Sequence, residues 1–218
     1  MIVAIDGPAA AGKSTVARAL AERLGLPFLD TGAMYRAVTL VVLERGLDPS
    51  DGPACERVAR EIELGFDRRG RLVVDDRLGE PDIRSERVTR EVSTVSSHPG
   101  VRRAIVPLQR AFAAQGGAVV EGRDTTSVVF PDADHKFFLM ASHEERARRR
   151  AAELGKPESE GAIRADIEAR DRADSSRADS PLVRVADAVA IETEGRTAEE
   201  VTELLLAHVL QSGREAQR

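Results

Sequence analysis

The sequence predicts an α/β fold in which a parallel sheet is flanked by helices. Short apolar runs rich in β-branched residues alternate with longer segments of helical periodicity, a pattern typical of buried parallel strands and their covering helices. A glycine-rich loop follows the first of these runs and opens a helical segment. One hairpin-like segment breaks the alternation, which indicates a single small insertion.

The first part of the chain shows this alternation clearly. Ile2–Ile5 is predicted to be a buried strand, because it is short, apolar and stopped by Gly7-Pro8. The next helix is expected to end at Gly25 and the following one at Gly46, since glycine is the usual residue just beyond a helix. The elements expected in this part are strands at 2–5 and 27–29 and helices at 13–24 and 33–45.

The insertion is predicted from two short runs, 63–67 and 71–75, that flank a glycine-containing turn at 68–70. It divides the chain into a core of residues 1–61 and 96–218 and an inserted subdomain at 62–95. Within the core, an interruption at 155–157 separates two polar helical segments, and we expect a lid at about 150–175. Ser142 and Glu145 have the spacing of a capping box at the start of the first segment. The remaining elements are expected at 99–114, 118–120, 136–139, 142–150, 161–178, 185–191 and 198–210.

Composition excludes several classes of function. The net charge of -5, from 32 Lys+Arg against 37 Asp+Glu, gives no reason to expect a nucleic-acid or membrane partner. Cys55 is the single cysteine, so an intramolecular disulfide is impossible, and the four histidines lack metal-ligand spacing. We expect a cytoplasmic protein without a signal peptide or membrane span. No heptad or aromatic patch indicates an oligomer, so a monomer is expected.

A phosphate-binding loop is the most specific motif, since residues 7–14 match G-x-x-x-x-G-K-[ST]. Its glycines let consecutive N–H groups point at phosphates, and the helix that follows adds the positive end of its dipole. Lys13 is predicted to reach the β- and γ-phosphates of ATP, and Ser14 to ligate Mg²⁺. The predicted donor-binding residues are Gly7, Pro8, Ala9, Ala10, Ala11, Gly12, Lys13, Ser14 and Thr15.

Such a loop also occurs in GTPases, ATPases and small-molecule kinases. The chain has no Asn-Lys-x-Asp sequence of the kind that reads guanine. Its arginines fall where a second anionic substrate could be bound, since Arg binds phosphate oxygens bidentately. Arg36 begins a helix, and Arg123 follows a strand. Arg170 and Arg177 are seven residues apart, which would place them on one helix face beside Asp171 and Asp174.

The run 146–150 has two interpretations, a solvated helix face with internal ion pairs or the base of a lid over ATP.

Several segments together resemble the bacterial cytidylate kinases, within the P-loop nucleoside monophosphate kinases. The resemblance runs from about Ile2 to Ala207, and it implies that fold, with a parallel sheet, an inserted NMP-binding subdomain and a short lid. The segments that carry it are Asp6-Gly7-Pro8, Asp30-Thr31-Gly32-Ala33-Met34-Tyr35-Arg36, Glu121-Gly122-Arg123-Asp124, Val128–Ala133 and Arg170–Leu182.

The resemblance implies transfer of the ATP γ-phosphate to CMP or dCMP with Mg²⁺. By position, it implies that Thr31 and Ser93 contact the monophosphate, while Arg102 and Asp124 read the cytosine. Arg36, Arg123 and Arg177 would clamp the acceptor phosphate, and Arg170 with Asp174 would hold its ribose. The implied catalytic residues are Lys13, Arg123, Arg170 and Arg177. Thr126 departs from the family, which usually has Gly there.

Two other functions are compatible with the motifs. One is a kinase of the same fold that phosphorylates another acceptor, such as UMP or shikimate. The other is a nucleotide-binding regulatory module that changes shape without transferring phosphate. Arginines on several separate elements favour a second phosphate-bearing substrate over a pure switch.

Overall fold

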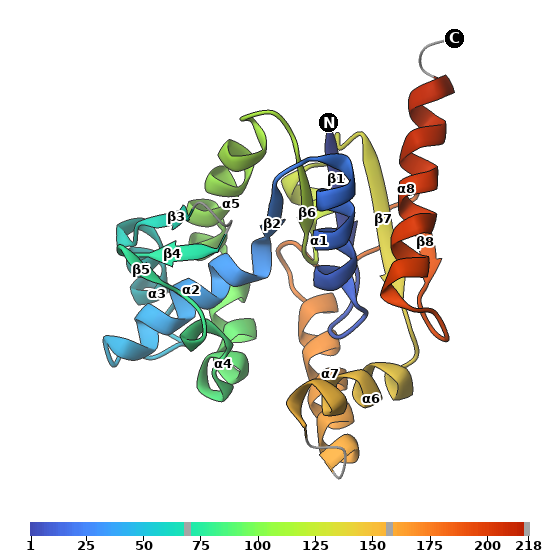
Figure 1. Ribbon diagram of the computed structural model, residues 1–218. Coiled ribbons are helices and arrows are strands. Elements are labelled where there is room, and N and C mark those ends of the chain that lie inside the picture. The colour runs from blue at the N-terminus through green and yellow to red at the C-terminus, as the bar shows by residue number, and fades with distance from the viewer. Residues whose placement is uncertain (68–70, 156–158, 216–218) are drawn as a thin grey trace. The chain divides into compact units, whose positions relative to one another are not determined.

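The computed structural model describes residues 1–67, 71–155 and 159–215. Contacts within the chain divide it into two compact units, each described here by itself (Figure 1). The first unit combines Met1–Leu29 with the chain from Gly116 onward, and the second unit is Asp30–Gln115.

A five-stranded sheet forms the centre of the first unit. The pairings of β1 with β6 and β7, and of β7 with β8, are parallel. β1 is the central strand of the order β2-β6-β1-β7-β8, so its residues Val3, Ala4 and Ile5 are fully buried. The strands are β1 (Ile2–Asp6), β2 (Phe28–Asp30), β6 (Ala118–Glu121), β7 (His135–Met140) and β8 (Val189–Glu192).

Two helices of the first unit share one hydrophobic core with the sheet. α1 (Lys13–Leu24) contributes Leu20, and α8 (Ala198–Glu215) contributes Leu205. Both side chains pack in a cluster with Phe137 of β7. Helical spacing of apolar residues therefore fixes the face that each helix turns to the sheet.

α6 (His143–Leu154) and α7 (Glu160–Ser175), which also belong to the first unit, have a small core of their own. Its buried members are Ala147 and Ala151 from α6 and Ile163 and Ile167 from α7.

The second unit consists of helices and a short antiparallel sheet. Three of its helices begin beside a side chain that satisfies an orphan N–H group, since Asp30, Asp51 and Ser85 each accept from the N–H three residues on. The elements are α2 (Thr31–Glu44), α3 (Gly52–Glu61), β3 (Leu64–Phe66), β4 (Leu72–Val74), β5 (Arg77–Leu78), a 3₁₀ helix (Asp82–Arg84), α4 (Glu86–Ser97) and α5 (Pro99–Ala113).

The predicted α/β class and parallel sheet are confirmed, as are the first strand, the helix at 13–24 and the pairing of the two hairpin runs. The hairpin turn at 68–70 lies outside the described residues. The sequence did not predict α3, α4 or β5. The last strand is shorter than predicted, because residues 186–188 form a turn before Val189.

The polar helix at 161–178 was predicted too long. α7 ends at Ser175, because the carbonyl oxygen of Asp174 accepts from the N–H of Leu182 at 2.8 Å instead of from the N–H four residues on, as it would in a longer helix. Arg177 therefore lies beyond the helix, and the prediction that it shares a helix face with Arg170 is wrong.

The compact second unit is wider than the predicted insertion at 62–95, since it begins at Asp30 and ends at Gln115. The physical reason is helix packing. α2 packs against α3 and α4, and α5 packs against α3 and α4, so these helices form one body with the small sheet.

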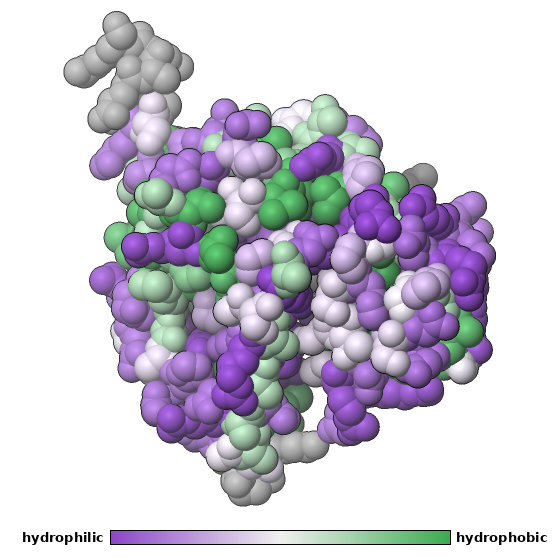
Figure 2. All heavy atoms as spheres, turned by 180° about the vertical axis from the view of Figure 1, so that it is seen from behind, coloured by the Kyte–Doolittle hydropathy of each residue, from purple (hydrophilic) through white to green (hydrophobic). Residues whose placement is uncertain are grey.

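Within the described ranges, no helix is both long and apolar enough to cross a bilayer. Hydrophilic residues cover most of the face in Figure 2, where hydrophobic residues form smaller groups between them.

The shared core of α1, α8 and the sheet makes a prediction about stability. Leu205 is fully buried, whereas its neighbour Leu204 is 42% exposed on the same helix. Leu205→Ala should lower the free energy of unfolding by about 2–5 kcal/mol, because it leaves a cavity. Leu204→Ala is the matched control and should cost less than about 1 kcal/mol. Urea titration measures both, and equal losses would contradict this packing.

Candidate functional site

The phosphate loop lies between β1 and α1 and has the backbone that its glycines allow. Gly7 and Gly12 have φ of 148° and 88°, and Ala10 between them has φ of 59°. A Cβ at Gly7 would lie 2.3 Å from the carbonyl oxygen of Leu139, so only glycine fits there. The structure thus places residues 7–15 at the carboxyl end of the central strand, as the motif predicts.

Lys13 is 5% exposed at the start of α1, and its Nζ donates to the carbonyl oxygen of Pro8 at 2.8 Å. Burial and, second to it, the charge of Arg123 lower the pKa of Lys13 from its ordinary value of 10.5 to about 7. The charges of Glu121, Asp6 and Asp174 oppose this shift. Lys13 therefore lies within a group of charges that the strand ends and α7 bring together.

Ser14 contacts an acid that the sequence analysis did not assign to the site. Its hydroxyl donates to Oε1 of Glu121 at 2.6 Å, and Glu121 is 4% exposed at the end of β6. A serine hydroxyl that donates its proton still has lone pairs with which to ligate a cation. Hydroxyl and carboxylate oxygens are the ligands that Mg²⁺ prefers, so this pair fits a magnesium ion.

Asp174 joins two of the predicted arginines. It is buried, and its Oδ2 accepts from Nε of Arg123 at 2.9 Å. Its Oδ1 accepts from Nη2 of Arg177. Burial raises the pKa of Asp174, but the charges of Arg123, Arg177 and Arg170 outweigh it, so the pKa lies below its usual value. The carboxylate stays ionised and holds both guanidinium groups in place.

Arg170 has a different environment. Burial lowers its pKa, and the positive charge of Arg123 lowers it further, so the two cations are close enough to repel each other. The buried Nε of Arg170 has no hydrogen-bond partner in the described part of the chain. A further anion beside Arg170 would relieve this repulsion.

The run at 146–150 was interpreted either as a solvated helix face or as the base of a lid over ATP, and its arginines differ in their surroundings. Arg148 and Arg150 pair with glutamates of their own helix, as on a solvated face. Arg146 is instead buried, and its Nη1 donates to the carbonyl oxygen of Ala9 at 3.0 Å and to Asp171 at 2.6 Å. Asp171 also accepts from the N–H of Ala9 at 3.3 Å, so α6 and α7 both hold the phosphate loop.

The capping box predicted at this helix is only half formed. Ser142 accepts from the N–H of Glu145, but the carboxylate of Glu145 binds Arg148 and Arg149 instead of returning to Ser142. The N–H of Ser142 donates to Glu194.

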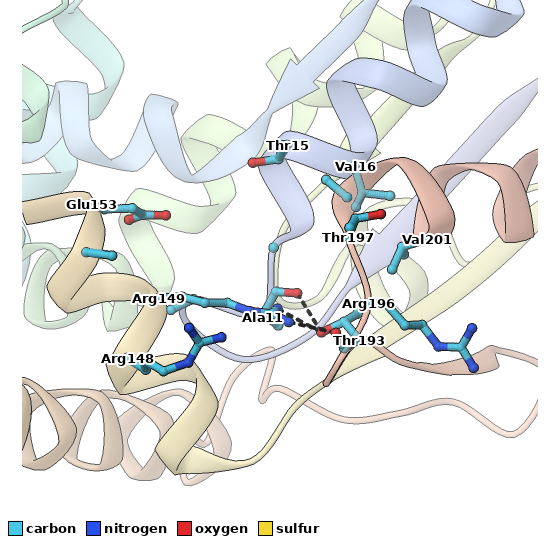
Figure 3. Close-up of a pocket in the computed structure, with 14 residues that line it drawn as sticks. Ala11, Thr15, Val16, Arg148, Arg149, Glu153, Thr193, Arg196, Thr197 and Val201 are labelled. Atoms are coloured by element: carbon cyan, nitrogen blue, oxygen red, sulfur yellow. Dashed lines mark hydrogen bonds between the residues drawn. The ribbon is translucent and has the colours of Figure 1, made fainter.

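A cavity of about 340 Å³ lies beside the phosphate loop, within the first unit (Figure 3). Arg149 from α6 crosses one wall and donates to Oγ1 of Thr193 at 3.0 Å. The hydroxyl of Thr193 in turn contacts the carbonyl oxygen of Ala11, so the cavity is bounded by the phosphate loop on this side. Other lining residues are Gly12, Thr15, Val16, Arg196, Thr197 and Val201.

The second unit holds the other predicted substrate residues. Thr31 is buried at the start of α2, and Arg36 of the same helix donates to Oγ1 of Thr89 at 2.9 Å. Ser93 is one turn beyond Thr89 on α4, so both lie on one helix face. Arg102 is buried, with its guanidinium carbon 5.2 Å from the ring centroid of Tyr35.

The predicted site residues thus fall into one group in each unit. The first unit holds the phosphate loop with Arg123, Asp124, Arg170, Asp174 and Arg177, and the second holds Thr31, Arg36, Ser93 and Arg102.

A model of the cytidylate kinase family matches residues 3–211 of this chain. The chain belongs to this family. A cytidylate kinase from Pelotomaculum thermopropionicum is 46% identical over 220 residues, which cover 98% of this chain and 97% of that protein. A bifunctional pantoate ligase/cytidylate kinase from Parasynechococcus marenigrum is 47% identical over 213 residues, covering 94% of this chain and 42% of that protein. The chain therefore spans less than half the length of this bifunctional relative.

Among solved structures, TT1252 from Thermus thermophilus is similar in fold. The TM-score is 0.50 at 24% sequence identity, and the match covers 97% of this chain and 96% of the other.

The sequence analysis named Glu121, Asp171 and Arg146 but assigned none of them a contact with the phosphate loop. Glu121 could have been found, because an acid that ends a buried strand beside a phosphate loop is unusual. Arg146 and Asp171 could not, because their contacts with Ala9 join segments far apart in the sequence.

The lowered pKa of Lys13 makes a prediction about pH. The folded chain releases this proton near pH 7, whereas the unfolded chain keeps it up to its ordinary value of 10.5. Between these values the unfolded state binds more protons, so stability should rise with pH. Lys13→Met removes this contribution. The free energy of unfolding of the unaltered protein, minus that of Lys13→Met, should increase from about pH 7 to 10 in urea titrations. A difference independent of pH would contradict the lowered pKa.

Proposed function

We propose that this chain transfers the γ-phosphate of ATP to CMP or dCMP, giving ADP and CDP or dCDP. The observation that carries the proposal is the charge group of the first unit. There, the lysine of a phosphate loop lies within electrostatic range of Arg123, Glu121 and Asp174. Phosphoryl transfer between two phosphates needs positive charge on both the donor and the acceptor side of one centre.

The donor side would use the phosphate loop and its surroundings. The backbone N–H groups of residues 10–14 and the ammonium of Lys13 would bind the β- and γ-phosphates. The adjoining cavity beside Arg149 would receive the adenosine of ATP. Ser14 and Glu121 would hold Mg²⁺, which when bound neutralises phosphate charge and aligns the phosphate oxygens.

On the acceptor side, Arg36, Arg123 and Arg177 would bind the CMP phosphate. Arg123 and Arg177 are already oriented by Asp174, which reduces the ordering that binding requires. Arg170 and Asp174 would contact the ribose, and Thr31 and Ser93 would contact other parts of the monophosphate.

Cytosine would be selected by Arg102 and Asp124. Asp124 is 4% exposed, and a buried carboxylate can accept a hydrogen bond from the exocyclic amino group of cytosine. Uracil has an oxygen at that position, which would repel the carboxylate. A polar mismatch of this kind discriminates strongly between substrates.

The chemical step needs no covalent intermediate. An oxygen of the CMP phosphate attacks the γ-phosphorus, the bond from that phosphorus to the β,γ-bridging oxygen breaks, and ADP leaves with the electron pair. Because the attacking oxygen is already anionic, the side chains need only align the groups and neutralise their charge. We also propose that the protein acts as a cytoplasmic monomer on free nucleotides, without nucleic-acid or membrane partners.

The proposal is tested by ADP formation from Mg-ATP with CMP, dCMP, UMP, AMP and GMP at equal concentrations. CMP and dCMP should give rates at least about tenfold above the others, because a polar mismatch discriminates more strongly than a difference of one methylene. A preference for another monophosphate would keep the kinase and overturn the roles of Asp124 and Arg102. ATP binding without any acceptor-dependent ADP release would overturn the kinase and favour a regulatory switch.

The role of Glu121 toward magnesium is tested separately. Glu121→Gln keeps the size of the side chain but removes its charge, so Mg²⁺ affinity should fall about tenfold. Calorimetry of ATP binding with and without Mg²⁺ should show that the metal strengthens ATP binding less in the variant. Glu192→Gln is the control, because Glu192 also ends a strand but is exposed. Equal magnesium dependence in both variants would contradict a metal-binding role.

A further inference from the structure

Asp6 is a fully buried carboxylate at the end of the central strand. Its Oδ1 accepts from the N–H of Thr125 at 2.9 Å and from the hydroxyl of the same residue at 2.7 Å. Its Oδ2 accepts from the N–H and the hydroxyl of Thr126 at 2.7 and 2.6 Å. Each carboxylate oxygen is thus satisfied by one threonine.

This arrangement holds a short segment of main chain firmly. A buried charge is costly unless it is hydrogen-bonded, and hydrogen bonds to a charged acceptor are stronger than neutral ones. Two of the four donors are backbone N–H groups, so the carboxylate fixes the backbone of Thr125 and Thr126 as well as their side chains. An ionised carboxylate only accepts hydrogen bonds, so all four bonds suit the charged form.

The segment that Asp6 holds follows directly after the predicted acceptor residues. β6 ends at Glu121, and the N–H of Gly122 still donates to Ile5 of β1 at 3.0 Å. The chain then passes through Arg123 and Asp124 before Thr125 binds Asp6. These two residues are therefore anchored to β1 on both sides, by Gly122 before them and by Thr125 after them.

A π-helical turn continues from this anchor. It spans Thr125–Val129, and the N–H of Phe130 donates to the carbonyl oxygen of Thr125 at 2.8 Å. The N–H groups of Val128 and Val129 both donate to the carbonyl oxygen of Asp124. The backbone around Asp124 is thus held by the turn as well as by Asp6.

Asp6 is followed directly in the sequence by Gly7, the first residue of the phosphate loop. The same side chain therefore connects the start of the loop that would bind the donor with the turn that would bind the acceptor. An error in its position would change the alignment of the two substrates.

We propose that Asp6, through Thr125 and Thr126, is a positioning residue for the acceptor, setting where Arg123 and Asp124 lie relative to the phosphate loop. The inference rests on the proposed function, in which these two residues bind the CMP phosphate and cytosine. It also gives a role to Thr126, the position at which the resemblance implies Gly. Thr126 does not have positive φ, and its hydroxyl supplies one of the four bonds.

The test compares isosteric variants that keep the charge of Asp6. Thr125→Val and Thr126→Val each remove one hydroxyl donor, while Thr125→Ser keeps it. Thr202→Val is the matched control, since Thr202 is also fully buried in the first unit and its hydroxyl bonds within α8. KM for CMP, KM for ATP, the CMP-to-UMP ratio of kcat/KM and the Tm are measured for each variant.

Thr125→Val and Thr126→Val should raise KM for CMP about tenfold, as expected for one lost charge-assisted hydrogen bond, with KM for ATP changed less than about twofold. The CMP-to-UMP ratio should fall in the direction of Asp124→Ala, which serves as the reference for lost base selection. Thr125→Ser, which keeps the hydroxyl, should have the KM for CMP and the CMP-to-UMP ratio of the unaltered protein. Thr202→Val should lower the Tm but leave the KM for CMP and the CMP-to-UMP ratio unchanged.

A lower Tm with unchanged KM for CMP in both valine variants would overturn the inference, because the network would then be structural only. An equal rise in the KM values for CMP and ATP would also overturn it. If the unaltered protein prefers another monophosphate, the roles of Asp124 and Arg102 in reading cytosine are wrong. The inference is then judged by the effect of the variants on the KM for that monophosphate. If no acceptor supports ADP formation, the proposed function and this inference both fail.

Discussion

Buried charge around Lys13 is the constraint on which the candidate site depends. An ammonium removed from water is costly, and the carboxylates of Asp6, Glu121 and Asp174 offset part of that cost, so that the pKa of Lys13 is lowered to about 7 and no further. Those carboxylates are themselves bound, Glu121 to Ser14 and Asp174 to Arg123. Each charge is thus held by a partner from a different part of the chain, and the first unit must fold as a whole before the set exists.

The sheet brings these partners together. Because β1 lies between β6 and β7 and both pairings are parallel, the carboxyl ends of three strands meet at one edge. Asp6 and Glu121 are the last residues of two of those strands. Ligands of open parallel sheets bind at this edge, outside the carboxyl ends of the strands. The same topology therefore explains both the location of the site and its charge.

The parts of the fold that could be predicted are those that depend on a few neighbouring residues in the sequence. Gly7, Gly12 and Lys13 identify the phosphate loop by spacing alone, and Gly25 marks the end of α1 correctly. The helix end after Arg170 was misjudged, because the carbonyl oxygen of Asp174 binds the N–H of Leu182, a contact that helical periodicity does not indicate. α3 and α4 were not predicted, because their buried residues, such as Val58 and Val92, stand singly among polar ones and form no apolar run.

Residues of the candidate site were predictable to the extent that motifs contain them. Arg123 and Asp124 were named because they follow a strand, and Asp174 because it stands close to Arg170 and Arg177 in the sequence. The structure places all three residues in the first unit, and their roles toward the substrate stay predictions. That Asp174 holds both Arg123 and Arg177 follows only from the folded chain. Glu121 was within a recognised motif, but its contact with Ser14 joins residues 107 positions apart and has no local signature.

Arg146 illustrates how little a substitution table says about such a position. Its guanidinium donates to two carbonyl oxygens, those of Ala141 and Ala9, and to the carboxylate of Asp171, in three different directions. A lysine carries the same charge but concentrates it on one nitrogen at the end of a flexible chain. Scoring schemes that treat the two residues as interchangeable would rate Arg146→Lys as harmless. At this joint between two helices and a loop, the shape of the cation matters more than its charge.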